Sequence, residues 1–167
     1  MAGPNGAFPR FQRRQAQTGS SGTFPLDFGG RDVVARLLMR LKAGPEAAGE
    51  GRHALDRLDG SIGDDRLSES RLLVTELLTN SVRHACSAGE WIMLDVRVDT
   101  TSMRIVVSDS GPGFDPQPQP RPHDERPGGW GLCLVDHLAD RWGVETDGTT
   151  SVWAELDHGG DNFVAAA

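Results

Sequence analysis

A glutamate and an asparagine lie four residues apart in a leucine-rich stretch, and both side chains end in oxygen ligands. On a helix, Glu76 and Asn80 would share one face, about 6 Å apart along the axis. Mg²⁺ commonly takes one or two such oxygens from a protein and completes its shell with phosphates and waters. The solvated edge of an amphipathic helix has the same spacing, so the pair alone leaves both interpretations open.

Two glycine-containing segments follow along the chain. The segment Asp109-Ser110-Gly111-Pro112-Gly113-Phe114 begins where a predicted strand ends. Its alternate glycines would let the backbone approach a flat ligand closely, although an ordinary Asp- and Gly-rich turn has a similar composition. The segment Gly128-Gly129-Trp130-Gly131 opens a predicted helix, whose free N–H groups suit phosphate. A flexible hinge is the alternative for this second segment.

Hydrophobic periodicity predicts the helices that would position these groups. Residues 31–42 are compatible with an edge strand or a short helix, whereas residues 46–58 and 65–85 have helical spacing. A third helix is predicted from about Gly131 to a stop at Trp142-Gly143. The core-facing stripe predicted for the second helix consists of Leu72, Leu73, Leu77, Leu78 and Val82.

Alternation of apolar and polar residues predicts two strand pairs. The first pair is 91–98 with 103–108, and the second is 144–146 with 150–156. The order of helices, strand pair, helix and strand pair predicts an α+β fold, a two-layer sandwich of a mixed, mainly antiparallel sheet packed on helices. We expect a flexible tail at 1–30, one domain at 31–160 and a short tail at 161–167.

Composition and charge exclude several classes of function. The net charge of the 167 residues is −7, and because residues 1–31 carry four arginines and one aspartate, the rest carries −10. An acidic domain is a poor ligand for phosphate backbones, so direct nucleic-acid binding is not expected. No apolar run is long enough to span a membrane. Two cysteines, Cys86 and Cys133, and no visible secretory signal predict a cytoplasmic protein.

In chain order, these segments resemble the GHKL-type ATPase/kinase domain shared by gyrase-type, histidine-kinase and MutL-type ATPases. Within that group, the closest resemblance is to the small bacterial serine/threonine kinases of anti-sigma-factor type. It covers about residues 37–157 and rests on four ordered segments. These are 74–85, 107–114, Gly129-Trp130-Gly131-Leu132 with Val135-Asp136, and Gly148-Thr149-Thr150.

The resemblance implies that ATP and Mg²⁺ bind at these segments. Asn80 would bind the Mg²⁺ that bridges the nucleotide phosphates. Asp109 would accept a hydrogen bond from the adenine amino group, selecting ATP over GTP. Gly111 and Gly113 would let the loop wrap the adenine, and Thr150 would lie near the adenine end.

The resemblance also assigns groups to the phosphates. Gly129 and Gly131 would present N–H groups to them, with Leu132 beside these glycines, and Arg83 would supply a positive charge. The segment 115–128 would form a lid over the nucleotide. Its Arg126, or Arg121, would reach the terminal phosphate. This lid is unusually rich in proline, which departs from the family pattern.

Glu76 decides which activity the resemblance implies, because a glutamate here acts in the family as general base on a serine hydroxyl or on water. The predicted function is an ATP-dependent serine/threonine protein kinase that phosphorylates a small antagonist protein and regulates transcription through a sigma factor. The alternative is a non-catalytic, ATP-gated protein-binding module. The resemblance further implies a homodimer formed through the sheet edge near the N-terminal strand.

Overall fold

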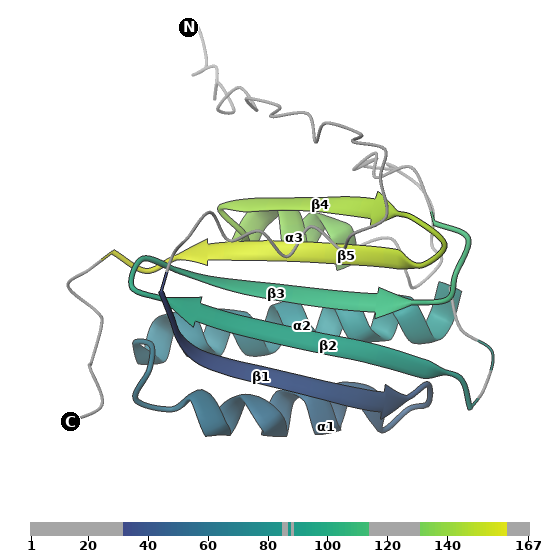
Figure 1. Cartoon of the computed structure of the whole chain (residues 1–167), viewed down its shortest axis with the longest axis horizontal. Coiled ribbons are helices and arrows are strands. Elements are labelled where there is room, and N and C mark those ends of the chain that lie inside the picture. The colour runs from purple at the N-terminus through teal and green to yellow at the C-terminus, as the bar shows by residue number, and fades with distance from the viewer. Residues whose placement is uncertain (1–31, 85–86, 88, 114–130, 160–167) are drawn as a thin grey trace, which may run out of the picture.

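The computed structural model describes residues 32–84, 87, 89–113 and 131–159, and this part of the chain forms two layers (Figure 1). One layer is a five-stranded sheet, and the other consists of helices packed on one face of that sheet. All four strand pairings are antiparallel. The predicted α+β sandwich is therefore confirmed. The predicted tails and the predicted lid lie outside the described residues.

The order of elements along the chain determines which ends of the strands meet. The sheet order is β1-β2-β3-β5-β4, so β1 and β4 are its edges. The elements are β1 (Val33–Lys42), α1 (Ala47–Ala54), the short 3₁₀ helix η1 (Leu55–Leu58), α2 (Asp64–His84), β2 (Trp91–Asp99), β3 (Ser102–Asp109), α3 (Gly131–Leu138), β4 (Arg141–Thr146) and β5 (Thr150–Asp157).

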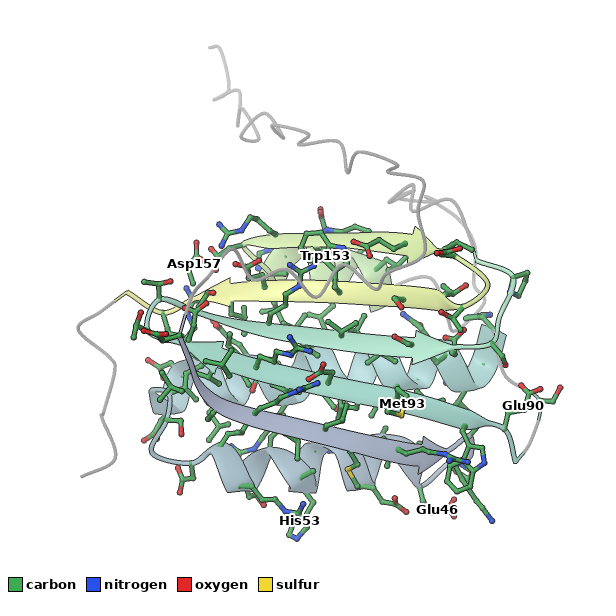
Figure 2. The ribbon with its side chains drawn as sticks, viewed as in Figure 1. Glu46, His53, Glu90, Met93, Trp153 and Asp157 are labelled. Carbon is green, nitrogen blue, oxygen red and sulfur yellow. The ribbon has the colours of Figure 1, made fainter. Side chains whose placement is uncertain are left out.

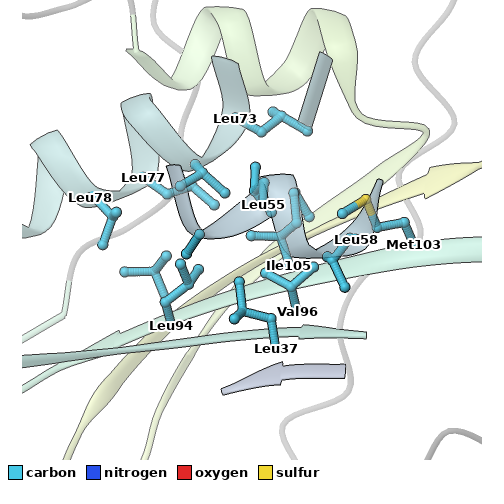
Figure 3. Close-up of a cluster of buried hydrophobic side chains, with 14 of the residues drawn as sticks. Leu37, Leu55, Leu58, Leu73, Leu77, Leu78, Leu94, Val96, Met103 and Ile105 are labelled. Carbon is cyan, nitrogen blue, oxygen red and sulfur yellow. The ribbon is translucent and has the colours of Figure 1, made fainter. Parts of the chain in front are cut away.

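The hydrophobic core lies between the sheet and the helices, as Figure 3 shows. Alternate residues of β2, among them Leu94 and Val96, point into it, and α2 contributes Leu73, Leu77 and Leu78 from the opposite side. Side chains that alternate between the two faces of a strand explain why the strict pattern of β2 and β3 predicted these strands so closely. The core thus fixes α2 against the middle of the sheet.

The sequence of residues 31–42 is compatible with either a strand or a helix. In the structure these residues contain the edge strand β1, which pairs with β2. Leu37 and Leu41 face the core, whereas Leu38 is exposed on the other face of the sheet. Because apolar residues occupy both faces, the stretch carries no clear period of two. The antiparallel pairing with β2 selects the strand.

One residue of the predicted core stripe is placed differently by the structure. Leu72 is 50% exposed, whereas its neighbour Leu73 is fully buried. Successive residues of a helix point about 100° apart, so Leu73 and Val74 occupy the face toward the core and Leu72 turns away. Leu72 instead lies one turn before Glu76 on the same side of α2.

Two predicted helix boundaries are also corrected. The helix predicted over 46–58 is divided into α1 and η1. The third helix, α3, ends at Leu138, and Trp142-Gly143 belongs to β4 rather than ending the helix. Gly143 stands opposite Trp153 of β5, and a Cβ at Gly143 would lie 2.9 Å from the indole ring. The lack of a side chain at Gly143 therefore allows the indole ring of Trp153 to lie close to the backbone of β4.

The face of the sheet away from the helices carries paired charges (Figure 2). Asp95 accepts hydrogen bonds from Arg36 Nη2 at 3.0 Å and from Arg97 Nη2 at 2.7 Å. Burial alone would raise the pKa of Asp95, but the hydrogen bonds from Arg97 and Arg36 outweigh it and hold that pKa below its usual value.

Within the described ranges, no helix has the length and apolar character that a membrane span requires.

Candidate functional site

The long helix α2 carries the first two site residues on one side. Glu76 and Asn80 are separated by one turn, and both are half-buried. Within the part of the chain that the structure describes, no hydrogen bond or ion pair engages either side chain. The Asn80 amide oxygen and the Glu76 carboxylate are therefore available to a ligand on this side of α2.

The end of β3 places Asp109 on the helix-covered face of the sheet. Met103, Ile105 and Val107 point into the core, and Asp109 continues this alternation. Its side chain is nevertheless polar, and only 4% of the residue is exposed. A buried carboxylate needs hydrogen-bond donors, because burial without them is costly.

Two donors reach Asp109 from different segments. The Ser81 hydroxyl of α2 donates to Asp109 Oδ2 at 2.6 Å. The backbone N–H of Gly111, in the loop after β3, donates to Asp109 Oδ1 at 2.9 Å. The carboxylate is thus held between the helix layer and the loop, and an ionised carboxylate retains further acceptor capacity for a ligand.

Thr150, the first residue of β5, completes this corner. It stands opposite Asp109 in the β3–β5 ladder, and its hydroxyl donates to the carbonyl oxygen of Gly111 at 2.7 Å. Thr150 is almost fully buried. The structure therefore brings Asp109, Gly111 and Thr150 together, although 41 positions separate the first from the last.

Gly113 is required by the course of the loop. Its φ is +79°, in the left-handed region that favours glycine. A Cβ at this position would lie 2.6 Å from the Thr146 hydroxyl oxygen at the end of β4. The loop therefore passes directly over the end of β4, on the same side as Thr150.

The N-terminus of α3 lies at this same end of the sheet. Thr146 of β4 pairs with Thr150, while Arg141 at the other end of β4 pairs with Glu155. The helix α3 ends just before Arg141, so its first residue, Gly131, lies toward the Asp109 end. Leu132 follows Gly131 and is half-buried.

The remaining predicted site residues are not all placed. Arg83 is exposed in the last turn of α2, three residues beyond Asn80, where a cation also suits the helix dipole. Gly129 and Arg126 lie outside the described residues, as does Arg121. The described part of the site therefore consists of a helix face, a strand end, a loop and the start of a second helix.

Sequence reasoning missed one residue of this corner, Ser81. The residue lies on the buried side of α2, three and four residues after Leu78 and Leu77. A buried hydroxyl almost always has a hydrogen-bond partner, so a serine on a core-facing stripe is a detectable signal. The identity of the partner, Asp109, is not evident from spacing.

The oxygen atom of Asn80 fits a Mg²⁺ ion that takes its other ligands from a nucleotide and from water. No group of three or more His, Cys, Asp or Glu side chains gathers in the described ranges to hold a metal ion. A single amide oxygen at Asn80 suits Mg²⁺, which usually keeps waters and phosphate oxygens as its other ligands. The buried acceptor Asp109 suits a flat ligand that carries a hydrogen-bond donor.

Comparison with known proteins finds one family whose model matches most of the chain. Residues 41–155 match the family model described as the histidine kinase-like ATPase domain, which is more than half of the chain. An anti-sigma F factor of Pasteuria penetrans is 31% identical over 87 residues. That match covers 46% of this chain and 57% of the Pasteuria protein, so the chain spans little more than half of that relative.

Other matches have longer alignments. The serine-protein kinase RsbW of Listeria monocytogenes serovar 1/2a is 29% identical over 119 residues, covering 63% of this chain and 76% of that protein. RsbW of Listeria innocua serovar 6a is 28% identical over 119 residues with the same coverage. Among solved structures, the mycobacterial sensor histidine kinase MprB is 18% identical, with a TM-score of 0.46, covering 73% of this chain and 98% of that one.

Proposed function

The chain belongs to the histidine kinase-like ATPase domain family, and we propose that it is an ATP-dependent serine/threonine protein kinase of anti-sigma-factor type. It would phosphorylate a small antagonist protein and thereby regulate a sigma factor. The names of the matched relatives, an anti-sigma F factor and a serine-protein kinase, support this choice within the family. We place its action in the cytoplasm, without direct contact to nucleic acid.

The observation that carries the proposal is the buried Asp109 carboxylate at the end of β3. Donors from Ser81 and Gly111 hold it, and Thr150 stands beside it. An ionised carboxylate accepts hydrogen bonds and donates none, so it matches the exocyclic amino group of adenine. The carbonyl group of guanine at the same ring position would oppose it.

The phosphates would extend from this corner toward α2 and α3. Asn80 would hold Mg²⁺, which supplies charge neutralisation at the phosphates when bound. The N–H groups at Gly131 and the exposed cation of Arg83 would face the phosphate chain. Gly129 and Arg126 would contribute from the segment before α3.

Glu76 is the group that we assign as general base. Its carboxylate would accept the proton of a serine hydroxyl while that oxygen forms a bond to the terminal phosphorus. The bond from this phosphorus to the bridging oxygen breaks, and ADP leaves with the electron pair. Glu76 lies one helical turn from Asn80 on the same side of α2, which supports a position near the terminal phosphate.

One observation favours a second candidate, a non-catalytic ATP-gated protein-binding module. Within the described residues, no side chain donates a hydrogen bond that would orient the Glu76 carboxylate as a base. In such a module, nucleotide binding would order a partner surface without phosphotransfer. A homodimer through the edge of β1 is compatible with either candidate.

Calorimetric titration of the full chain tests the proposal. We expect Mg²⁺-dependent binding of ATP and of a non-hydrolysable ATP analogue, and much weaker binding of GTP. Formation of ADP on incubation with Mg-ATP then separates the kinase from the binding module. Failure of both ATP and the analogue to bind, with and without Mg²⁺, would refute both candidates.

A further inference from the structure

Ser81 is the residue of α2 that contacts the candidate base-binding carboxylate, and it directly follows Asn80. Its hydroxyl donates to Asp109 Oδ2 at 2.6 Å, and both residues are buried. We propose that Ser81 is a positioning residue that sets the preference of this site for adenine, by fixing the orientation of the Asp109 carboxylate. This inference rests on the proposed nucleotide site.

A single donor does not fix the plane of a carboxylate. The N–H of Gly111 holds Asp109 Oδ1 at 2.9 Å, but the terminal torsion of an aspartate has a broad energy well. A coupled change of the two side-chain torsions of Asp109 would move Oδ2 while Oδ1 stays within reach of the Gly111 N–H. A second donor on Oδ2 removes this freedom, and Ser81 supplies it from the opposite layer of the fold.

The fixed plane matters because recognition of adenine depends on direction as well as charge. The lone pairs that Ser81 and Gly111 leave unused must point toward the base if they are to accept its amino hydrogen. The exclusion of guanine depends on the same atoms, since two acceptors would then face each other. A carboxylate free to turn would lose affinity for adenine and would tolerate other bases better.

A comparison within α2 argues against a merely structural role for this hydroxyl. Ser70 is also fully buried on α2, but its hydroxyl donates to the carbonyl oxygen of Leu67 at 2.7 Å, within its own helix. Ser81 instead donates across to β3. The helix could satisfy a buried serine locally, so the contact to Asp109 is a distinct feature of position 81.

The experiment uses calorimetry on the full chain with ATP and with purine riboside triphosphate, which lacks only the amino group of adenine. For Ser81→Ala we expect the Kd of ATP to rise about tenfold, because a carboxylate that is free to turn would lose most of its hydrogen bond to the adenine amino group. Losing one hydrogen bond to a charged group has an effect of about this size. The Kd of purine riboside triphosphate should stay within about twofold of wild type, because the carboxylate contributes nothing to that ligand. The preference for the amino group therefore falls about tenfold.

Two matched controls separate this effect from the loss of a buried or neighbouring hydroxyl. Ser70→Ala removes a buried hydroxyl from the same helix, and Ser108→Ala removes one adjacent to Asp109 that contacts Ser151 on the other face of the sheet. Neither should change the ratio of the two dissociation constants. Ser81→Cys, a smaller perturbation with a weaker donor, should lower the ratio in part and serves if Ser81→Ala does not fold.

Three outcomes would overturn the inference. If Ser81→Ala weakened both nucleotides by the same factor, Ser81 would be a structural residue only. If neither Ser81 variant changed the affinity for ATP, the hydrogen bond to Asp109 would have no part in recognition. If the wild-type chain bound neither nucleotide, the proposed function would fail together with the role of Ser81.

Discussion

Asp109 and Thr150 stand directly opposite each other in the β3–β5 ladder, and both are buried at the end of the sheet where α3 begins. The Thr150 hydroxyl donates its hydrogen bond to the carbonyl oxygen of Gly111, and the N–H of Gly111 donates to the Asp109 carboxylate. A strand end, a loop and a neighbouring strand thus form one hydrogen-bonded unit. The side chain best suited to recognise a base is also the one that the fold holds from two sides.

Asp109→Asn tests whether this carboxylate binds the base. The amide would retain one acceptor but could present an NH₂ group to the adenine amino group, so we expect a roughly ten- to hundredfold loss of ATP affinity. Calorimetry measures it. Asp147→Asn, an equal change of charge in the exposed turn between β4 and β5, is the control. Equal ATP affinity of Asp109→Asn and wild type would remove Asp109 from the site.

Substitutions of Asn80 and of Glu76 should have different effects, the first on ATP binding and the second on ADP formation. Asn80→Ala is expected to abolish Mg²⁺-dependent ATP binding, because it removes the proposed metal ligand. Glu76→Gln should bind ATP as wild type does while ADP formation with water as acceptor falls roughly 10²–10⁴-fold, the usual contribution of a general base. Calorimetry and an ADP assay measure the two effects.

Glu50→Gln, on the exposed surface of α1, is the control for removing a carboxylate. If Glu76→Gln formed ADP at the wild-type rate, Glu76 would not be the general base. No ADP formation even in wild type, together with tight ATP binding, would instead favour the non-catalytic module.

Local patterns predicted the elements of this fold well. The strict alternation in β2 and β3 reflects burial of one face, and it placed both strands to within a residue or two. The leucine-rich α2 was evident from its period, but with so many leucines the period could not show that Leu72 faces outward. Trp142-Gly143 was misread as a helix stop because the packing of Gly143 beneath Trp153 depends on a partner strand.

The candidate site was only partly accessible to such reasoning. Glu76 and Asn80 share a helix, so spacing alone placed them on one side. Asp109 and Thr150 meet only because β3 and β5 are neighbours in the sheet, and no local spacing encodes that register. Ser81 was missed for the same reason, since its partner lies 28 residues away.

Asp99 should make stability depend on pH in the acid range. Burial opposes its charge, but hydrogen bonds from the backbone and side chains of Thr101 and Ser102 outweigh burial and lower the pKa of Asp99 from 3.8 to about 2. A lowered native pKa means that the charged form stabilises the fold at neutral pH. This contribution, about 2 kcal/mol, should be lost as the pH falls from about 4 to about 2.

Urea unfolding of wild type and Asp99→Asn at a series of pH values checks this expectation. The free energy of unfolding of wild type should fall by about 2 kcal/mol more than that of the variant across this range. Asp147→Asn should track wild type, because Asp147 is exposed in a turn. Parallel pH profiles of wild type and Asp99→Asn would contradict the assignment.

His158 should be replaceable with a gain in stability. The residue follows β5 and is buried, and neither ring nitrogen has a hydrogen-bond partner among the described residues. Removing unsatisfied buried polar atoms recovers their desolvation cost, so His158→Leu should raise the free energy of unfolding by roughly 1 kcal/mol. Chemical denaturation measures it, with His137→Leu at an exposed position of α3 as control. A clear loss of stability would indicate that the ring has a partner.

Two glycines of α1 should respond oppositely to alanine. A Cβ at Gly51 would lie 2.4 Å from Leu78 Cδ1 and 3.0 Å from Val74 Cγ1, because α1 approaches α2 closely there. Gly49 lies half a turn away, and a Cβ would meet only an Arg52 nitrogen at 3.9 Å. Alanine favours a helix over glycine by up to about 1 kcal/mol, so Gly49→Ala should stabilise the protein.

At Gly51, overpacking should outweigh that gain. Forcing a methyl group into a packed helix contact costs roughly 1–3 kcal/mol, so Gly51→Ala should lower the midpoint of thermal unfolding while Gly49→Ala raises it. Leu78 and Val74 lie on the face of α2 opposite Glu76 and Asn80, and their displacement would shift the helix that carries these two residues. Gly51→Ala should therefore also weaken Mg-ATP binding measured by calorimetry. If both variants were equally stable, the close approach of α1 to α2 would not be a constraint on this fold.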